Sequence, residues 1–408
     1  MSWWKASLGP LAALILLTGF FSACQKTAKK SPPIPISEET PSTGSAAQPV
    51  VPVGPPLEIP VPTENSGKTR ITLKAQQLTS SGENTDARFS TDGKRILFVS
   101  RSRSGHHQAQ IYELHLGAMR EKRITFHDGD DASPVYATDG VHIFFSSSTD
   151  EIKEEPHVSD RLLRTYRPEV FAKRHASRAE AKDSDEEGSE IYEQTLHGRS
   201  IERLTHSPGF DGDVEPDPSS KNIVFSSART KKTTRLFVAK GKSQTALSQG
   251  DFVDRFPRIS QNGKWLIWSR KAVGGEDMHL MIMENGKSNR PPRALTSGSS
   301  LDLHPAWHPS GEIAVFASNR DDRVFNLYTI DREGRCLKRL TQSEFDLLQP
   351  VFNPDGKQII FTARRGDQHQ LFVLDYKPPA DCIGDPVKTG PSPGVPILPA
   401  PSSGEGKK

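Results

Sequence analysis

The chain has 408 residues, of which 34% are hydrophobic and 25% are charged, so it is long and apolar enough for a globular body. Its net charge of +3 argues against a nucleic-acid binder, which needs a concentrated basic stripe. The three cysteines, Cys24, Cys336 and Cys382, lack the short spacings of a zinc knuckle or a CxxC redox site.

Residues 1–23 are predicted to be a signal peptide. Lys5 precedes an apolar run, residues 8–21, which at about fourteen residues is too short for a comfortable membrane span. The run ends in the sequence FSAC, which resembles the lipobox of bacterial lipoproteins. That resemblance implies that Cys24 is acylated, for example with palmitate, and that Gln25 directs the protein to the outer membrane. Phe21 stands where that family usually has Leu, and the alternative is an ordinary signal peptide with an incidental Cys.

Two segments rich in Pro, Ser and Thr flank the central part of the chain. They are residues 24–68 and residues 378–408. Such sequence cannot bury a core and favours extended structure. We therefore predict a disordered tether, a folded part over residues 69–377, and a disordered tail.

One pattern recurs six times in the folded part. An acidic position is followed three residues later by Pro in most copies, then by an Asp-Gly type of turn and an apolar strand. The copies are 84–100, 131–147, 211–227, 254–270, 302–318 and 347–363. Each apolar strand carries an aromatic residue at the matching position, namely Phe98, Phe145, Phe225, Trp268, Phe316 and Phe361. Each copy predicts two strands joined by a hairpin, because Asp-Gly tolerates the positive φ of tight turns.

A third and a fourth strand complete each unit. A third strand like 110–116 and a fourth like 122–125 follow every copy except the last, which lacks its fourth strand. The sequence QQLT, residues 76–79, precedes the first copy without a partner. Four antiparallel strands in about 45 residues are typical of a propeller blade. We therefore predict an all-β, six-bladed β-propeller whose ring is closed by the N-terminal strand pairing with the last blade. The alternative is an open array of hairpins.

The repeat resembles that of TolB-type propellers, P-x-W-S-P-D-G-K-x-I-x-F-x-S followed by I-Y and then L-T. Residues 308–311 and 353–356 are the nearest local matches. The resemblance covers residues 69–377 and implies the propeller fold. TolB proteins carry an α/β domain before the propeller and are typically free in the periplasm. Here a lipidated tether is expected instead, so membership of the Tol-Pal machinery does not follow.

An acidic or amide residue stands at the start of each first strand, on the face that we call the top. These residues are Asn84, Asp131, Asp211, Asp254, Asp302 and Asp346. A ring of carboxylates at the channel mouth is a candidate site for a basic peptide segment or for a divalent cation such as calcium. The alternative is that each Asp caps a local turn. No other cofactor is expected.

An insertion, residues 150–189, lies between the second and third strands of the second blade, at the same face. Its basic centre, residues 161–178, is either a partner-binding arm or lid, or a solvated loop. Residues 76–79 must run from the bottom face to the top face. We therefore expect the tether to approach from below and the top face to point away from the membrane.

Cys336 and Cys382 follow the third strands of neighbouring blades, so both are expected at the bottom face. In an oxidising compartment a disulfide between them is one expectation, and two free thiols are the other. No G-x-S-x-G elbow and no convergent set of histidines occurs, so no catalytic residue is predicted.

The sequence therefore predicts a lipid-anchored, TolB-like module without enzymatic activity in the bacterial cell envelope. It would bind an envelope protein or peptide segment through its top-face loops and channel mouth. We expect a monomer at the outer membrane, facing the periplasm, that touches the membrane only through its lipid and binds no nucleic acid. The alternative is a periplasmic lyase or hydrolase acting on a carbohydrate or cell-wall substrate.

Overall fold

The computed structural model describes residues 54–62, 72–127, 129–149, 188–196, 201–230, 232–287 and 291–378. These ranges lie within one compact unit, residues 47–408. The predicted signal peptide, Cys24, Cys382 and residues 150–187 of the insertion lie outside the described residues. Within the described ranges, no helix has the length and apolar character needed to cross a membrane.

Every named element is a β-strand, so the predicted all-β class is confirmed. The strands are β1 (Leu57–Pro60), β2 (Thr72–Gln77), β3 (Glu83–Phe89), β4 (Arg95–Arg101), β5 (Gln110–His115), β6 (Arg120–Arg123), β7 (Asp131–Tyr136), β8 (His142–Ser147), β9 (Glu190–Thr195), β10 (Ile201–Arg203), β11 (Asp211–Pro216), β12 (Ile223–Thr230), β13 (Thr233–Lys240), β14 (Ser243–Ala246), β15 (Phe252–Ile259), β16 (Trp265–Ala272), β17 (Met278–Glu284), β18 (Arg293–Ala294), β19 (Asp302–Trp307), β20 (Ile313–Ser318), β21 (Asn326–Asp331), β22 (Lys338–Arg339), β23 (Asp346–Phe352), β24 (Gln358–Arg365) and β25 (Gln368–Asp375).

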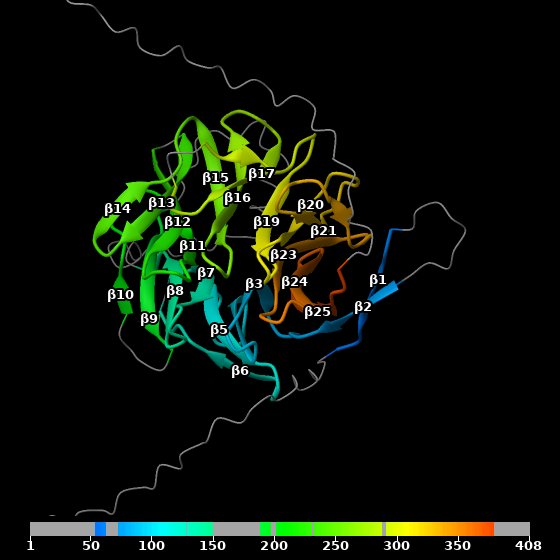
Figure 1. The fold of residues 1–408 in the computed structure, drawn as a ribbon. Coiled ribbons are helices and arrows are strands. Elements are labelled where there is room, and N and C mark those ends of the chain that lie inside the picture. The colour runs from blue at the N-terminus through cyan, green and yellow to red at the C-terminus, as the bar shows by residue number, and fades with distance from the viewer. Residues whose placement is uncertain are drawn as a thin grey trace, which may run out of the picture. The chain divides into compact units, whose positions relative to one another are not determined.

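The strands form antiparallel sheets in chain order, as in a propeller. Three sheets have four strands each, in the orders β3-β4-β5-β6, β7-β8-β9-β10 and β19-β20-β21-β22. A fourth sheet contains β11–β14 and β15–β18, two antiparallel groups joined by one parallel pair, Thr234 with Val253. The first strand of each group faces a common axis (Figure 1).

The last sheet has the order β1-β2-β25-β24-β23. Strand β2 pairs antiparallel with β25, through Gln76 with Val373 and Gln77 with Phe372. The N-terminal strand therefore supplies the fourth strand that the last repeat lacks, as the sequence predicted.

A hydroxyl near the end of each fourth strand holds the third strand. The Oγ1 of Thr125 accepts a hydrogen bond from the Ile111 backbone N–H at 2.9 Å. Five equivalent contacts go from Leu371 to Thr79, Ile191 to Thr205, Leu236 to Ser248, Leu280 to Thr296 and Leu327 to Thr341. The recurring L-T sequence thus satisfies a backbone donor that would otherwise lack a partner at the strand end.

The aromatic residues of the repeat form the core. Phe98, Phe145, Phe225, Trp268, Phe316 and Phe361 are all 0% exposed. Burying a large apolar side chain is worth about 1.5–3 kcal/mol, so each of these positions contributes to the stability of its blade.

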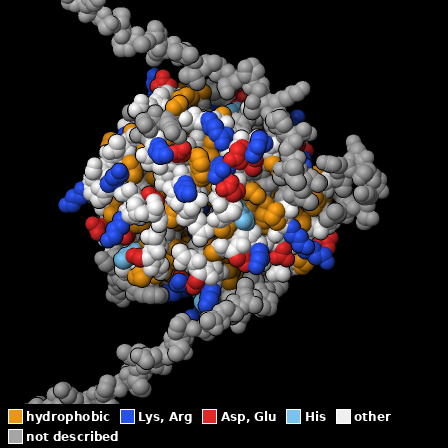
Figure 2. Space-filling view, in the orientation of Figure 1, with side chains coloured by type: hydrophobic (Ala, Val, Ile, Leu, Met, Phe, Trp, Pro, Cys, Tyr) orange, Lys and Arg blue, Asp and Glu red, His pale blue; other side chains and the backbone are white. Residues whose placement is uncertain are grey.

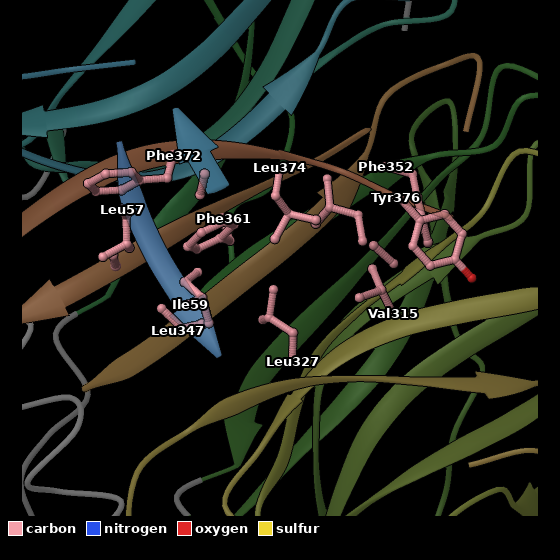
Figure 3. Close-up of a cluster of buried hydrophobic side chains, with 14 residues drawn as sticks. Leu57, Ile59, Val315, Leu327, Leu347, Phe352, Phe361, Phe372, Leu374 and Tyr376 are labelled. Atoms are coloured by element: carbon pink, nitrogen blue, oxygen red, sulfur yellow. The ribbon is translucent and has the colours of Figure 1, made fainter. Parts of the chain in front are cut away.

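Strand β1 corrects the predicted tether. Residues 24–68 were expected to lack structure, yet Leu57 and Ile59 are 5% and 1% exposed and pack with Phe361, Phe372 and Leu374 (Figure 3). The alternation Leu-Glu-Ile places both apolar side chains on one face of a short strand, and that face meets the core of the last blade.

The direction of β1 also overturns the expected approach of the chain. Strand β1 is antiparallel to β2, with Leu57 opposite Ala75 and Pro60 opposite Thr72. Gly54 lies against the Gln77 side chain, towards the top end of β2. The chain therefore enters this sheet from the top face and not from below, because one more antiparallel strand reverses its direction.

Candidate functional site

The predicted acidic ring is buried at the starts of the first strands. None of its six members is more than 8% exposed. Five of them pair with an arginine near the end of the second strand of the same blade or just after it. The pairs are Asn84 with Arg103, Asp211 with Arg229, Asp254 with Arg270, Asp302 with Arg320 and Asp346 with Arg364.

In Asp254, hydrogen bonds occupy both oxygens of the carboxylate. Its Oδ1 accepts hydrogen bonds from Arg270 Nε at 2.7 Å and from Trp268 Nε1 at 2.9 Å. Its Oδ2 accepts one from Arg270 Nη2 at 2.8 Å. In Asp302, burial raises the pKa, but the His279 imidazole, whose Nδ1 is 3.7 Å from Oδ2, and the charge of Arg320 outweigh it and leave the pKa below its ordinary value.

Asp131 is the member of the ring without an arginine partner of this kind. It accepts a hydrogen bond from Thr125 Oγ1 at 2.5 Å, and burial raises its pKa well above the ordinary value. In the described part of the chain, no group of three or more His, Cys, Asp or Glu side chains could hold a metal ion. The geometry favours the local structural role for this ring, and cation or peptide binding there stays a prediction.

A second set of residues, two positions further along the first strand and three in the last blade, faces the axis. These axial residues are Asp86, Ser133, Asp213, Phe256, His304 and Gln349, and all have φ between 51° and 58°. The register of every first strand shifts at this point, as in a β-bulge. Left-handed backbone in residues other than Gly is strained, and it persists only where surrounding contacts hold it.

Axial side chains hold the backbone of the next blade. Asp213 Oδ2 accepts a hydrogen bond from the Phe256 N–H at 3.2 Å and one from Arg255 Nε at 2.6 Å. Gln349 Oε1 accepts one from the Asp86 N–H at 3.0 Å and so links the last blade to the first. The left-handed conformation thus lets a side chain of one blade reach an amide of its neighbour.

The axial residues leave a small polar pocket. It is lined by Asp86, Ala87, Arg88, Arg258, His304, Gln349, Pro350 and Val351. Its volume admits roughly one water-sized molecule. A sugar ring therefore does not fit the pocket in this conformation.

Glu215 lies near the axis and titrates near neutral pH. Burial raises its pKa from 4.5 to about 7, although the charge of Arg88 and the hydrogen bond from the Ile259 N–H act to lower it. Its Oε2 is 3.8 Å from Arg258 Nη1. The ionised form is therefore less favourable in the folded protein than in water.

This shift predicts a pH-dependent stability. Because the folded pKa lies above the unfolded one, the contribution of Glu215 to the free energy of unfolding falls as pH rises from about 4.5 to 7. At about 1.4 kcal/mol per pKa unit, the shift corresponds to a loss of about 3 kcal/mol. We expect Glu215→Gln to gain that amount over the parent at pH 8 and nothing at pH 4, in urea unfolding measured at both values. A difference between the two proteins that does not change with pH would contradict the assignment.

Cys336 lies between β21 and β22, at the bottom face. It is disulfide-bonded and 8% exposed, and its backbone N–H donates to Asp331 Oδ1 at 2.7 Å. Its partner is not among the described residues, because the other two cysteines of the sequence, Cys24 and Cys382, both lie outside them. The pairing of Cys336 with Cys382 stays a prediction.

Known proteins match the part of this chain that carries the repeat. Residues 176–351 match the family model described as the TolB beta propeller domain. A protein TolB homolog from Chlorobium luteolum is 28% identical over 192 residues, which cover 45% of this chain and 42% of that relative. The chain thus matches less than half the length of this curated relative.

Two solved structures are similar in fold. An oligogalacturonate lyase in complex with manganese is 12% identical, with a TM-score of 0.50 and coverage of 79% of this chain and 97% of the lyase. TolB from Acinetobacter baumannii is 19% identical, with a TM-score of 0.49 and coverage of 70% of this chain and 60% of that protein. Together, the repeat and the sheet topology show an all-β propeller fold, and residues 176–351 are similar to the TolB beta propeller domain.

Proposed function

We propose that this chain is a TolB-like binding module of the bacterial cell envelope, carried on a lipidated N-terminus, that recognises an envelope protein or peptide through its top-face loops. The observation that carries the proposal is that side chains fill most of the space around the axis. With room for about one water at the centre, the loops and not the channel offer the area that a partner needs.

We further infer that six blades form a closed ring. The first strand β3 contacts β23, β24 and β25 of the last sheet, which supports closure. The hydrogen bonds from the Asp86 N–H to Gln349 Oε1 and from Asn84 Nδ2 to Gln370 Oε1, at 3.0 and 2.9 Å, join the same two blades. A closed ring leaves only short sheet edges at the outer strands and makes a rigid platform for loops.

Phe126 is the best candidate contact on the top face. It lies in the loop between β6 and β7, is 72% exposed, and has the Arg123 guanidinium 4.8 Å from its ring centre. Aromatic and arginine side chains are enriched at protein interfaces. On the face drawn in Figure 2, acidic and basic side chains are interspersed, so charge of one sign does not dominate that face.

A matched pair of variants tests this surface. Val141, in the hairpin between β7 and β8 of the same blade, is 55% exposed at the bottom face. We expect Phe126→Ser to weaken capture of a specific partner from crosslinked envelope extract at least tenfold, and Val141→Ser to leave it unchanged. Neither change should alter stability by more than about 0.5 kcal/mol, since both side chains are exposed. Equal capture by both variants would move the binding site away from Phe126.

The alternative is an envelope lyase or hydrolase acting on a carbohydrate. The observation that favours it is the polar axial pocket, where His304 and Arg88 lie with Asp86. The likeness to the lyase supports the fold alone. Depolymerisation of a glycan by the full chain, lost in His304→Ala, together with no specific capture, would replace the binding proposal with this one.

A further inference from the structure

Arg88 on β3 is buried and makes no direct hydrogen bond or ion pair with the residues that the structure describes. It is 8% exposed, and its Nε is buried without a hydrogen bond. In the described ranges, no hydrogen bond or ion pair joins Arg88 to any residue, although its charge acts on the carboxyl groups of Asp86 and Glu215. A buried guanidinium nitrogen without a hydrogen bond is costly, because it has lost the water that satisfied its N–H group.

Arg258 on β15 brings a second unsatisfied donor to the same pocket. It is 7% exposed, and its Nε also lacks a hydrogen bond. Its Nη1 donates to the Pro257 carbonyl at 2.6 Å and is 3.8 Å from Glu215 Oε2. Arg88 and Arg258 come from different blades, and both line the axial pocket.

We propose that Arg88 and Arg258 hold one small monovalent anion, of the size of chloride or formate, in the axial pocket. A guanidinium carries several donors in a fixed fork and prefers anionic acceptors. A water molecule satisfies a donor but supplies no counter-charge. Asp86 lines the same pocket and repels a bound anion when it is ionised, so the site takes no more than one small anion.

The neighbouring charges support this stoichiometry. Asp213 is paired with Arg255 at 2.6 Å, and Glu215 lies beside Arg258, so Arg88 is the axial arginine with no ion pair within 4.0 Å in the described ranges. A bound anion would join blades on opposite sides of the axis in the same way that the axial hydrogen bonds join neighbours. The site therefore predicts an effect of the anion on stability, separate from any effect on partner capture.

The test compares thermal unfolding of the full chain in sodium chloride, sodium formate and sodium gluconate at equal ionic strength. Gluconate is monovalent but too large for the pocket. We expect the unfolding midpoint to rise saturably by about 3 °C in chloride or formate relative to gluconate. Arg88→Met should lose this rise. Arg332→Met, which removes a surface arginine paired with Glu312, should keep it and so controls for general salt effects.

An equal rise of the unfolding midpoint in the parent and in Arg88→Met would overturn the proposal, as would no rise in the parent. Either result would indicate that the pocket holds only water. If Arg88→Met does not fold, Arg258→Met replaces it. The chloride NMR line width of the parent protein then gives an independent readout. Broadening that formate reverses supports the site, and broadening that formate leaves unchanged contradicts it.

Discussion

Replacing Asp254 by Ala should lower the free energy of unfolding by about 3–5 kcal/mol, the cost of breaking a buried ion pair from one side. Asp254 is 1% exposed and accepts two hydrogen bonds from Arg270 and one from Trp268. The variant leaves the Arg270 guanidinium, whose side chain is 13% exposed, without its counter-charge. Urea unfolding followed by tryptophan fluorescence measures the loss.

Asp251 provides the matched control. It lies three residues before Asp254 and is exposed, so Asp251→Ala should change stability by less than about 0.5 kcal/mol. Adding Arg270→Met to Asp254→Ala should recover part of the loss, because it removes the unpaired charge. A loss below about 1 kcal/mol in Asp254→Ala would show that the carboxylate is not needed by the fold, and would return the acidic ring to the candidates for cation or peptide binding.

The fold was predictable from the repeat, because every blade needs the same residue types at the same positions and these recur in the sequence. Phe98 and its equivalents mark the second strand, and all of them are fully buried. The L-T sequence marks the fourth strand, and QQLT without a partner indicated the pairing of β2 with β25. These signals are local, so they can be read without knowing the neighbouring blades.

The axial residues could not be recognised in the same way. A bulge adds one residue to a strand and changes which side chains face the axis, and nothing in the alternation of Asp86 or His304 with its neighbours marks that shift. One signal was present: four of the six axial residues, Ser133, Phe256, His304 and Gln349, stand directly before a Pro. The prediction therefore chose the acidic or amide residues two or three positions earlier, five of which the structure pairs with arginines.

Strand β1 was missed because composition argued against it. Leu57–Pro60 follows two prolines and ends in a third, and that pattern favours an extended, unpaired chain. The strand exists because the last sheet offers a hydrophobic face next to β2, which only the tertiary structure brings into place.

Ile59→Ala should lower the free energy of unfolding by about 2–4 kcal/mol, the usual cost of truncating a fully buried Ile. Ile59 is 1% exposed, packs in the cluster that contains Phe361 and Leu347 (Figure 3), and belongs to a strand whose last carbonyl, of Pro60, accepts a hydrogen bond from the Gln342 N–H at 2.8 Å. Urea unfolding of the full chain measures the change. The exposed Glu58 of the same strand gives the control, since Glu58→Ala keeps the backbone pairing and removes no buried surface.

The size of the loss distinguishes two roles for the segment before the propeller. A loss of about 2–4 kcal/mol in Ile59→Ala, with little change in Glu58→Ala, means that β1 is part of the cooperative fold and that the chain leaves the last sheet at the top face. A loss close to that of Glu58→Ala means that β1 detaches before the propeller unfolds, since an edge strand that opens locally does not contribute to global stability. In that case the top face is not tied to the N-terminal segment, and the tether begins only at β2.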